Sequence, residues 1–246
     1  MSTALSVAAL IGASDAPVVV ADRGPVRFIV LNRPTVRNAL TRQMRRDFPG
    51  LIAAAEAAAE VAAIVLTGAP PAFSGGVDLK ERAQAGAAPL VRPNPGEVLR
   101  AAQKPVIAAV NGACATGALE MALSCTFIVA ADEARFADTH ARVGVVPRWG
   151  QLSLLPRAIG VRRARQMMAT GEFIDARTAL AWGLVNEVVP GKGLLDRCAA
   201  IGAAIATADA RCLATCLAAL TAGEAAAGAA GDAIEAAAIS RHDDGQ

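Results

Sequence analysis

Residues 104–120 read KPVIAAVNGACATGALE, and this stretch decides the fold class. Residues 105–111 form a continuous apolar run that ends at Gly112, as expected for a strand that helices cover on both faces. A loop of small residues follows, and a helix is predicted to begin near Gly117 and to run to Cys125. Because a buried strand leads through a tight loop into a helix, the stretch predicts an α/β domain.

A second unit of the same form comes earlier in the chain. Residues 61–67 form another buried apolar run, and residues 73–80 read FSGGVDLK. The paired Gly75 and Gly76 allow a sharp turn and let the backbone approach a ligand, with its amides free to donate. Glycine pairs between a strand and a helix mostly form ordinary turns, so this segment by itself favours a structural role.

The loop that begins at residue 112 has glycines at the separation found in phosphate-binding loops. Such a loop needs Lys followed by Ser or Thr, but Ala118 and Leu119 stand at those positions, which argues against nucleotide hydrolysis. What is left is a helix N-terminus at Gly117. Its unpaired amides and the positive end of the helix dipole favour a developing negative charge.

The N-terminal half predicts a hairpin and a long helix before these units. Residues 18–21 and 26–31 are β-branched runs separated by a turn-forming quartet, which indicates a β-hairpin. A helix capped by Thr41 is predicted to run towards Glu60, with a bend or an interruption at Pro49.

Two segments are predicted to lack regular structure. Residues 1–17 read as a loose tail, since they have neither the basic start nor the length of a signal peptide. Residues 83–96 are rich in Ala, Gly and Pro, which predicts a surface segment and a candidate ligand-entry loop.

The second half of the chain is predicted to become wholly helical after Pro190. Helical patterns also precede this point, with a strand at residues 127–130 and another at residues 185–189. We therefore divide the chain into a core, residues 1–190, and a C-terminal helical region, residues 191–246. The predicted helices cover residues 152–159, 162–169, 176–182, 192–206, 211–220 and 232–240.

The composition limits the class of protein. The chain has 246 residues, 54% of them apolar, which is enough for one well-buried domain. With 24 basic and 22 acidic residues, its net charge of +2 gives no field that would gather nucleic acid or an anionic membrane. No segment offers the roughly 20 uninterrupted apolar residues that a membrane span needs.

Cysteine and histidine usage indicates a reducing compartment and no metal site. Five cysteines are an odd number without a CxxC pair, so we expect free thiols and a cytoplasmic protein. Cys212 and Cys216 are four residues apart, but His140 and His242 are the only histidines, and neither stands at zinc-ligand spacing.

Several segments taken together resemble the enoyl-CoA hydratase/isomerase, or crotonase, family. They occur in the family's order between Val18 and Pro190. The resemblance implies a crotonase-like spiral of ββα turns, a C-terminal layer of helices that joins subunits into a trimer or dimer of trimers, and coenzyme A as part of the substrate, with no separate cofactor. The matching segments are residues 31–34 (LNRP), 38–40 (NAL), 73–80, 104–112 leading to Glu120, and 181–185 (AWGLV).

The resemblance also implies roles for four residues. In the family, two backbone amides polarise the thioester carbonyl, and these are the N–H groups of Val77 and Gly117 in this chain. Such donors stabilise the oxygen as charge grows on it, by about 3 to 4 kcal/mol per donor. Glu120 matches the first catalytic glutamate, which orients and deprotonates the attacking water in a hydratase. The second glutamate is replaced by His140.

This replacement leaves two readings of His140 open. An imidazole can take and give a proton near neutral pH, so His140 could protonate the α-carbon after water adds at the β-carbon, with Asp138 orienting the ring. Alternatively, His140 is a hydrogen-bonded pocket residue without a chemical step.

The substrate-binding expectations also depart from the family at one position. Arg148 stands where the family usually has a glycine near the second acid, and it could pair with a substrate carboxylate, pair with Glu120 or point to solvent. Arg37 and Lys80 match positions near the phosphates and pantetheine of coenzyme A, and Gly75 and Gly76 are also expected to bind the substrate.

We therefore expect an enoyl-CoA hydratase that adds water to a 2-enoyl-CoA thioester. Two alternative functions stay open. The first uses the same pair of amides on the thioester carbonyl, and the second keeps only the fold. One is double-bond isomerisation or another enolate-forming reaction, and the other is an acyl-CoA-binding protein without catalysis. A serine hydrolase is disfavoured because the GxSxG elbow is missing from the sequence.

Overall fold

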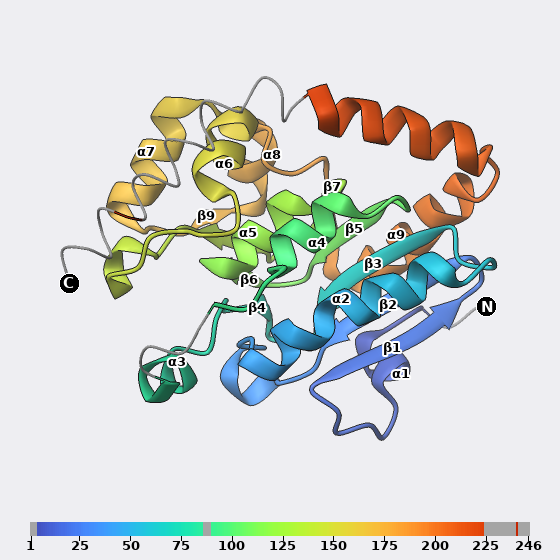
Figure 1. Ribbon diagram of the computed structural model, residues 1–246, viewed down its shortest axis with the longest axis horizontal. Coiled ribbons are helices and arrows are strands. Elements are labelled where there is room, and N and C mark those ends of the chain that lie inside the picture. Colours follow the sequence, from blue (N-terminus) through green and yellow to red (C-terminus); the bar gives the residue numbers. More distant parts are fainter. Residues whose placement is uncertain (1–3, 86–89, 224–239, 241–246) are drawn as a thin grey trace.

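The core of the molecule is a six-stranded sheet that crosses the middle of the computed structural model (Figure 1). The structure describes residues 4–85, 90–223 and 240. The first two strands pair antiparallel and all the later pairs are parallel. The strand order is β1 (Val18–Arg23), β2 (Val26–Leu31), β3 (Ala63–Gly68), β5 (Val106–Val110), β7 (Phe127–Ala131) and β10 (Glu187–Val189).

Helices cover both faces of this sheet, which explains the continuous apolar runs of β3 and β5. On one face pack α2 (Arg42–Ala57), α4 (Pro95–Ala101) and α5 (Gly117–Ser124), which share one core with alternate residues of the strands. On the other face pack α1 (Val7–Ile11) and α9 (Leu194–Ile205), which form a second core with the remaining strand residues. The predicted α/β class is confirmed.

A second, smaller sheet lies beside the first and was not predicted from the sequence. Its order is β4 (Ala72–Ser74), β6 (Ala113–Ala115), β8 (Arg135–Ala137) and β9 (Ile174–Asp175). β4, β6 and β8 pair in parallel, and β9 pairs antiparallel with β8. Strands of two or three residues are too short to show a periodic pattern, so only the folded chain reveals them.

The remaining helices surround this small sheet on one side of the molecule (Figure 1). α6 and α7 pack on one another, and α6 also packs on α5. Their bounds are α3 (Leu79–Ala85), α6 (Gln151–Ile159), α7 (Val161–Thr170) and α8 (Ala176–Trp182), and short 3₁₀ turns lie at Pro34–Val36, Ala141–Val143 and Gly191–Gly193.

One prediction about the N-terminal half was wrong, and of the bend or interruption expected at Pro49 the interruption was wrong. The expected loose tail contains α1, which Ser6 caps and whose Leu10 is buried in the second core. α2 runs through Pro49 without interruption, although proline removes one hydrogen bond of the helix. Its apolar stripe, including the buried Phe48 and Ile52, packs against the first core and outweighs that loss.

The predicted irregular segment at residues 83–96 is shorter than expected. α3 extends to Ala85, and α4 begins at Pro95, where Asn94 and Glu97 form a reciprocal capping box. Proline at the first position of a helix is well tolerated because its missing N–H has no partner there. Residues 86–89 lie outside the described residues.

The C-terminal region begins against the sheet and then leaves it. Leu194, Leu195 and Cys198 of α9 are buried in the second core, while a further helix, Ala210–Gly223, is largely exposed. In the described residues no single helix has the length and apolarity to cross a bilayer. Among the described residues, one pair of helical segments has the required length and apolarity when taken together. The pair is Gly191–Ile205 and Ala210–Gly223, and a bend of 109° separates the two segments. The predicted helix at residues 232–240 lies outside the described residues except for Ser240.

Candidate active site

Three parallel strands of the small sheet end at one edge, and the predicted catalytic residues follow them. β4 leads into Gly75–Val77, β6 leads into Gly117, and β8 leads into Asp138 and His140. β4 pairs with β6 and β6 pairs with β8, so the three following segments emerge side by side. Residues that are far apart in the sequence therefore meet at the carboxyl ends of parallel strands, a usual place for ligand sites.

Thr116 joins the first two of these segments. Its Oγ1 donates a hydrogen bond to the carbonyl oxygen of Gly75 at 2.9 Å. Its φ of 53° lies in the left-handed region, which costs free energy for a β-branched residue and is tolerated where the surroundings enforce it. Gly76 has no room for a side chain, because an added Cβ would lie 2.5 Å from Thr116 Oγ1 and 2.9 Å from the Gly117 nitrogen.

Among the described residues, the amides of Val77 and Gly117 have no acceptor. Around Val77 every neighbour is bonded: the N–H of Gly75 donates to Arg37 O, that of Gly76 to Ser74 Oγ, and that of Asp78 to Leu40 O. For Val77 and Gly117 no acceptor exists within the part of the chain that the structure describes. Since nearly all buried amides in proteins are paired, these two N–H groups are available for a ligand.

Asn38 fixes the shape of the loop that carries Val77. Its fully buried Nδ2 donates to the carbonyl oxygens of Ala69 and Ala72, each at 2.7 Å, and of Phe73 at 3.2 Å. The hydroxyl of Ser74 donates to the Asn38 carbonyl at 2.9 Å. One side chain thus ties together the chain on both sides of the β3–β4 turn.

Glu120, His140 and Asp138 form a buried line of three side chains. His140 Nε2 lies 3.3 Å from Glu120 Oε2, and His140 Nδ1 lies 2.8 Å from Asp138 Oδ1. Their exposed fractions are 2%, 6% and 1% in the order named. Asp138 Oδ1 also accepts the backbone N–H of His140 at 3.1 Å, so it holds both the ring and the chain of that residue.

The two carboxylates decide the protonation state of His140. Burial lowers the pKa of an imidazole, but the hydrogen bonds and charges of Asp138 and Glu120 outweigh it and raise the pKa of His140 to about 9. His140 is therefore an imidazolium at neutral pH, with a proton on each ring nitrogen. Because an imidazolium carries a proton that it can give up, the pair places an acid and a carboxylate base in contact.

Trp149 connects Glu120 to the amide of Gly117. The backbone N–H of Trp149 donates to Glu120 Oε1 at 2.6 Å. The backbone carbonyl oxygen of Trp149 accepts from Arg100 Nη1 at 2.7 Å. Its indole ring covers the start of α5, since a Cβ on Gly117 would lie 3.0 Å from Trp149 Cζ3. The sequence did not suggest Trp149, because it lies in an irregular segment 29 residues from Glu120.

Two other predicted residues lie close to the loop of Gly75. Arg37 is exposed, adopts a left-handed φ of 52°, and accepts the Gly75 N–H at 2.8 Å through its carbonyl oxygen. Lys80 is exposed in the first turn of α3, which begins two residues after Val77. Both cations therefore stand where the loop meets solvent.

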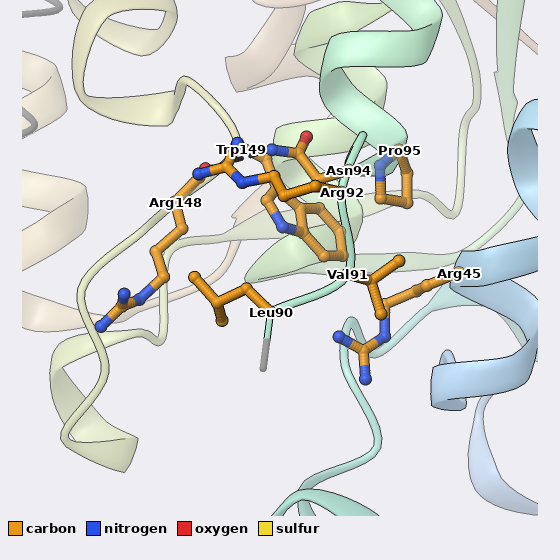
Figure 2. Close-up of a pocket in the computed structure, with 8 residues that line it drawn as sticks. All are labelled: Arg45, Leu90, Val91, Arg92, Asn94, Pro95, Arg148 and Trp149. Carbon is orange, nitrogen blue, oxygen red and sulfur yellow. Dashed lines mark hydrogen bonds between the residues drawn. The ribbon is translucent and has the colours of Figure 1, made fainter. Parts of the chain in front are cut away.

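Arg148 lines a small cavity together with Trp149 (Figure 2). Both oxygens of Glu120 are engaged, Oε1 by the backbone N–H of Trp149 and Oε2 by His140. The cavity is closed on its other side by Arg45 of α2, with Leu90 and Val91 between the two arginines (Figure 2).

Comparison with known proteins places the chain in a family. The model of the enoyl-CoA hydratase/isomerase family matches residues 22–243. The chain belongs to that family. An enoyl-CoA hydratase from Mycobacterium avium has the same fold, with a TM-score of 0.85, 39% sequence identity, and coverage of 94% of this chain and 98% of the other.

Further relatives of the chain carry the same family description. The enoyl-CoA hydratase of Mycobacterium tuberculosis H37Rv is 40% identical with a TM-score of 0.84, over 92% of this chain and 99% of the other. A protein of Rhizobium meliloti named "Probable enoyl-CoA hydratase" is 37% identical over 187 residues, which are 74% of this chain and 71% of that protein. The crotonase fold expected from the sequence is therefore confirmed.

Proposed function

We propose that this protein adds water to a 2-enoyl-CoA thioester. The observation that carries the proposal is the contact between Glu120 and His140 behind the N-terminus of α5. It sets a carboxylate beside a proton donor, and two unpaired amides stand at the mouth of the same helix. The names of the relatives in the family agree with this activity.

The proposed chemistry divides between the amides and the side chains. The N–H groups of Val77 and Gly117 hold the thioester oxygen and stabilise the negative charge that develops when water attacks the β-carbon. Glu120 takes a proton from that water while the oxygen of the water bonds to the β-carbon. His140 gives its Nε2 proton to the α-carbon, and the electrons of the enolate form the new C–H bond.

The close pair also allows the site to return to its starting state. After one turnover Glu120 holds the proton of the water and His140 has lost its own. Since 3.3 Å separates Glu120 Oε2 from His140 Nε2, one proton transfer between them restores the carboxylate and the imidazolium. The chemistry uses only groups of this chain, and coenzyme A enters as part of the substrate.

The carrier and the assembly are further parts of the proposal. Arg37 and Lys80 would bind the phosphates of coenzyme A beside the Gly75 loop, as the family resemblance implies. The exposed helix Ala210–Gly223 supports association into a trimer or a dimer of trimers, because its apolar side chains otherwise face water. Leu220, for instance, is 67% exposed. Sedimentation should give three or six subunits, and Leu220→Arg should reduce this number.

Location in the cytoplasm also remains a proposal. All five cysteines, two of which are buried and two exposed, are free thiols.

Burial raises the pKa of Cys114 well above its usual value, so this thiol next to the site stays neutral.

The test is direct measurement of hydration. With crotonyl-CoA the ultraviolet absorbance of the conjugated thioester should fall, and the product should gain the mass of one water. Absorbance that stays constant across several acyl-chain lengths would contradict the proposal. A rearranged product of unchanged mass would favour isomerisation, and binding without turnover, unchanged in Glu120→Gln, would favour a non-catalytic protein.

A further inference from the structure

Two of the residues that line the cavity beside Trp149 belong to segments that adjoin the unpaired amides of Val77 and Gly117. On one side, Val77 pairs with Leu40 in a short parallel bridge, and Leu40 lies just before α2, which carries Arg45. On the other side, the Trp149 ring covers Gly117. A chain attached to a carbonyl that both amides hold would therefore start next to this cavity.

The cavity is small and is lined by three arginines. Its volume is ≈ 20 Å³, which is room for a group the size of one water molecule. A cavity of this size takes only the end of an acyl chain, and its aliphatic lining residues are Leu90 and Val91. The complete lining is Arg45, Leu90, Val91, Arg92, Asn94, Pro95, Arg148 and Trp149 (Figure 2).

The guanidinium of Arg45, at one wall of the cavity, has N–H donors that its contacts with the described residues leave unused. Its Nε donates to the Thr41 carbonyl at 3.2 Å. In the described residues, its two terminal nitrogens make no hydrogen bond, and the nearest carboxylate is Glu81 Oε2 at 3.9 Å. That carboxylate already accepts the N–H of Arg42 at 2.6 Å. The Arg45 side chain is 14% exposed, and its terminal nitrogens still reach water, so a bound carboxylate would take the place of that water.

The surroundings of Arg45 carry an excess of positive charge. Burial lowers the pKa of Arg45, and the charges of Arg42 and Arg82 lower it further, against the single favourable charge of Glu81. Arg92 is satisfied by a close ion pair with Glu97 at the surface. A bound anion would relieve this imbalance, because a guanidinium binds a carboxylate with two parallel hydrogen bonds.

We infer that the site takes acyl-CoA thioesters whose chain ends in a carboxylate, with Arg45 as the residue that binds it and Arg148 on the opposite wall. The inference rests on the proposed function, because it assumes that the two amides hold the thioester carbonyl. It assigns the distal end of the substrate, which the sequence alone left open, to α2.

Binding of saturated thioesters tests this inference without any turnover. Titration calorimetry should give at least about tenfold tighter binding for the monothioester of adipic acid than for hexanoyl-CoA, which has the same chain length. Arg45→Met should remove most of this preference, and Arg45→Lys should keep part of it. Arg46→Met is the matched control, because Arg46 is the exposed neighbour on α2 and does not line the cavity.

Three outcomes would overturn the inference. The first is equal affinity of the wild-type protein for the two thioesters, a result that needs no variant and so does not depend on how a variant folds. The second is a preference that Arg45→Met leaves in place. The third is a loss of binding affinity in Arg45→Met that is equal for both thioesters and for free coenzyme A. Arg45 would then bind the coenzyme A part of the substrate.

Turnover separates this inference from the proposed function. Hydration of 2-hexenoyl-CoA with equal binding of the two saturated thioesters would keep the function and reject the substrate class. Tighter binding of the carboxylated thioester without hydration of either enoyl form would reject the function and keep the binding site.

Discussion

Nε2 of His140 lies 3.3 Å from Oε2 of Glu120, although twenty positions separate the two residues in the sequence. The contact turns two separate candidates into one unit, in which Asp138 holds the far side of the ring. A carboxylate that faces an imidazolium is poised to accept a proton from water, and the imidazolium is poised to give one.

Replacing Glu120 should abolish turnover and preserve binding. Glu120→Gln keeps an oxygen for the N–H of Trp149 but cannot take a proton, so kcat for crotonyl-CoA should fall by about 10²- to 10⁴-fold. The affinity for a saturated acyl-CoA should stay the same. Glu172→Gln, an exposed carboxylate away from the site, is the control, and an equal loss in both variants would contradict the role of Glu120.

The charge of His140 should make stability depend on pH. Its folded pKa of about 9 exceeds the value of about 6.5 for an unfolded chain, so its stabilisation is complete below pH 6.5 and disappears as pH rises through 9. The difference in unfolding free energy between wild type and His140→Gln should shrink by roughly 3 kcal/mol over that range.

Urea unfolding at several pH values measures this difference. His242→Gln, which removes the only other histidine of the chain, should show no such trend. If His140 is the proton donor, kcat should also decline above pH 9. A kcat that stays flat to pH 10 would leave His140 as a structural partner of Glu120.

A methyl group at Gly117 should block the site. The added Cβ would meet Trp149 Cζ3 at 3.0 Å and Cη2 at 3.4 Å, so either the ring or the start of α5 must shift. Gly117→Ala should lower kcat/KM by at least about tenfold, because the proposed oxyanion donor would move. Gly193→Ala, where nothing lies within 4 Å, should have normal activity. Normal kinetics in Gly117→Ala would argue against a donor at this position.

Loss of the Asn38 amide should destabilise the loop of Val77. Asn38→Ala leaves the buried carbonyls of Ala69, Ala72 and Phe73 without their donor, which should cost about 3 kcal/mol or more of unfolding free energy. Asn32→Ala, which removes bonds to the carbonyls of residues 14 and 16 near the N-terminus, should cost less. Chemical denaturation compares the two, and equal losses would contradict the anchoring role.

Much of the fold could be read from local sequence. The apolar runs that became β3 and β5, and the glycine-containing loops after them, are properties of a few neighbouring residues, so their type was predictable. The helix at Gly117 was predictable for the same reason, together with its unpaired first amides. α1 was missed because its five residues are held by burial of Leu10 and not by their own pattern.

The site itself was only partly readable. Glu120 and His140 could be named, yet their contact, the bond from Trp149 and the three acceptors of Asn38 all join residues from distant parts of the chain. So does the cavity in which Arg45 faces Arg148. Such contacts follow from the pairing of three very short strands, β4, β6 and β8, which leave no periodic signal.

The sequence by itself determined which candidate groups the chain offers for the proposed chemistry: the backbone amides of Val77 and Gly117, the carboxylate of Glu120 on α5, and His140 where the family has a second acid. The tertiary structure decided how those groups stand to one another and therefore the charge of the histidine. The physical reason is that bonding and backbone propensity are local, whereas the pKa of a buried group depends on neighbours that only long-range packing brings within a few ångströms.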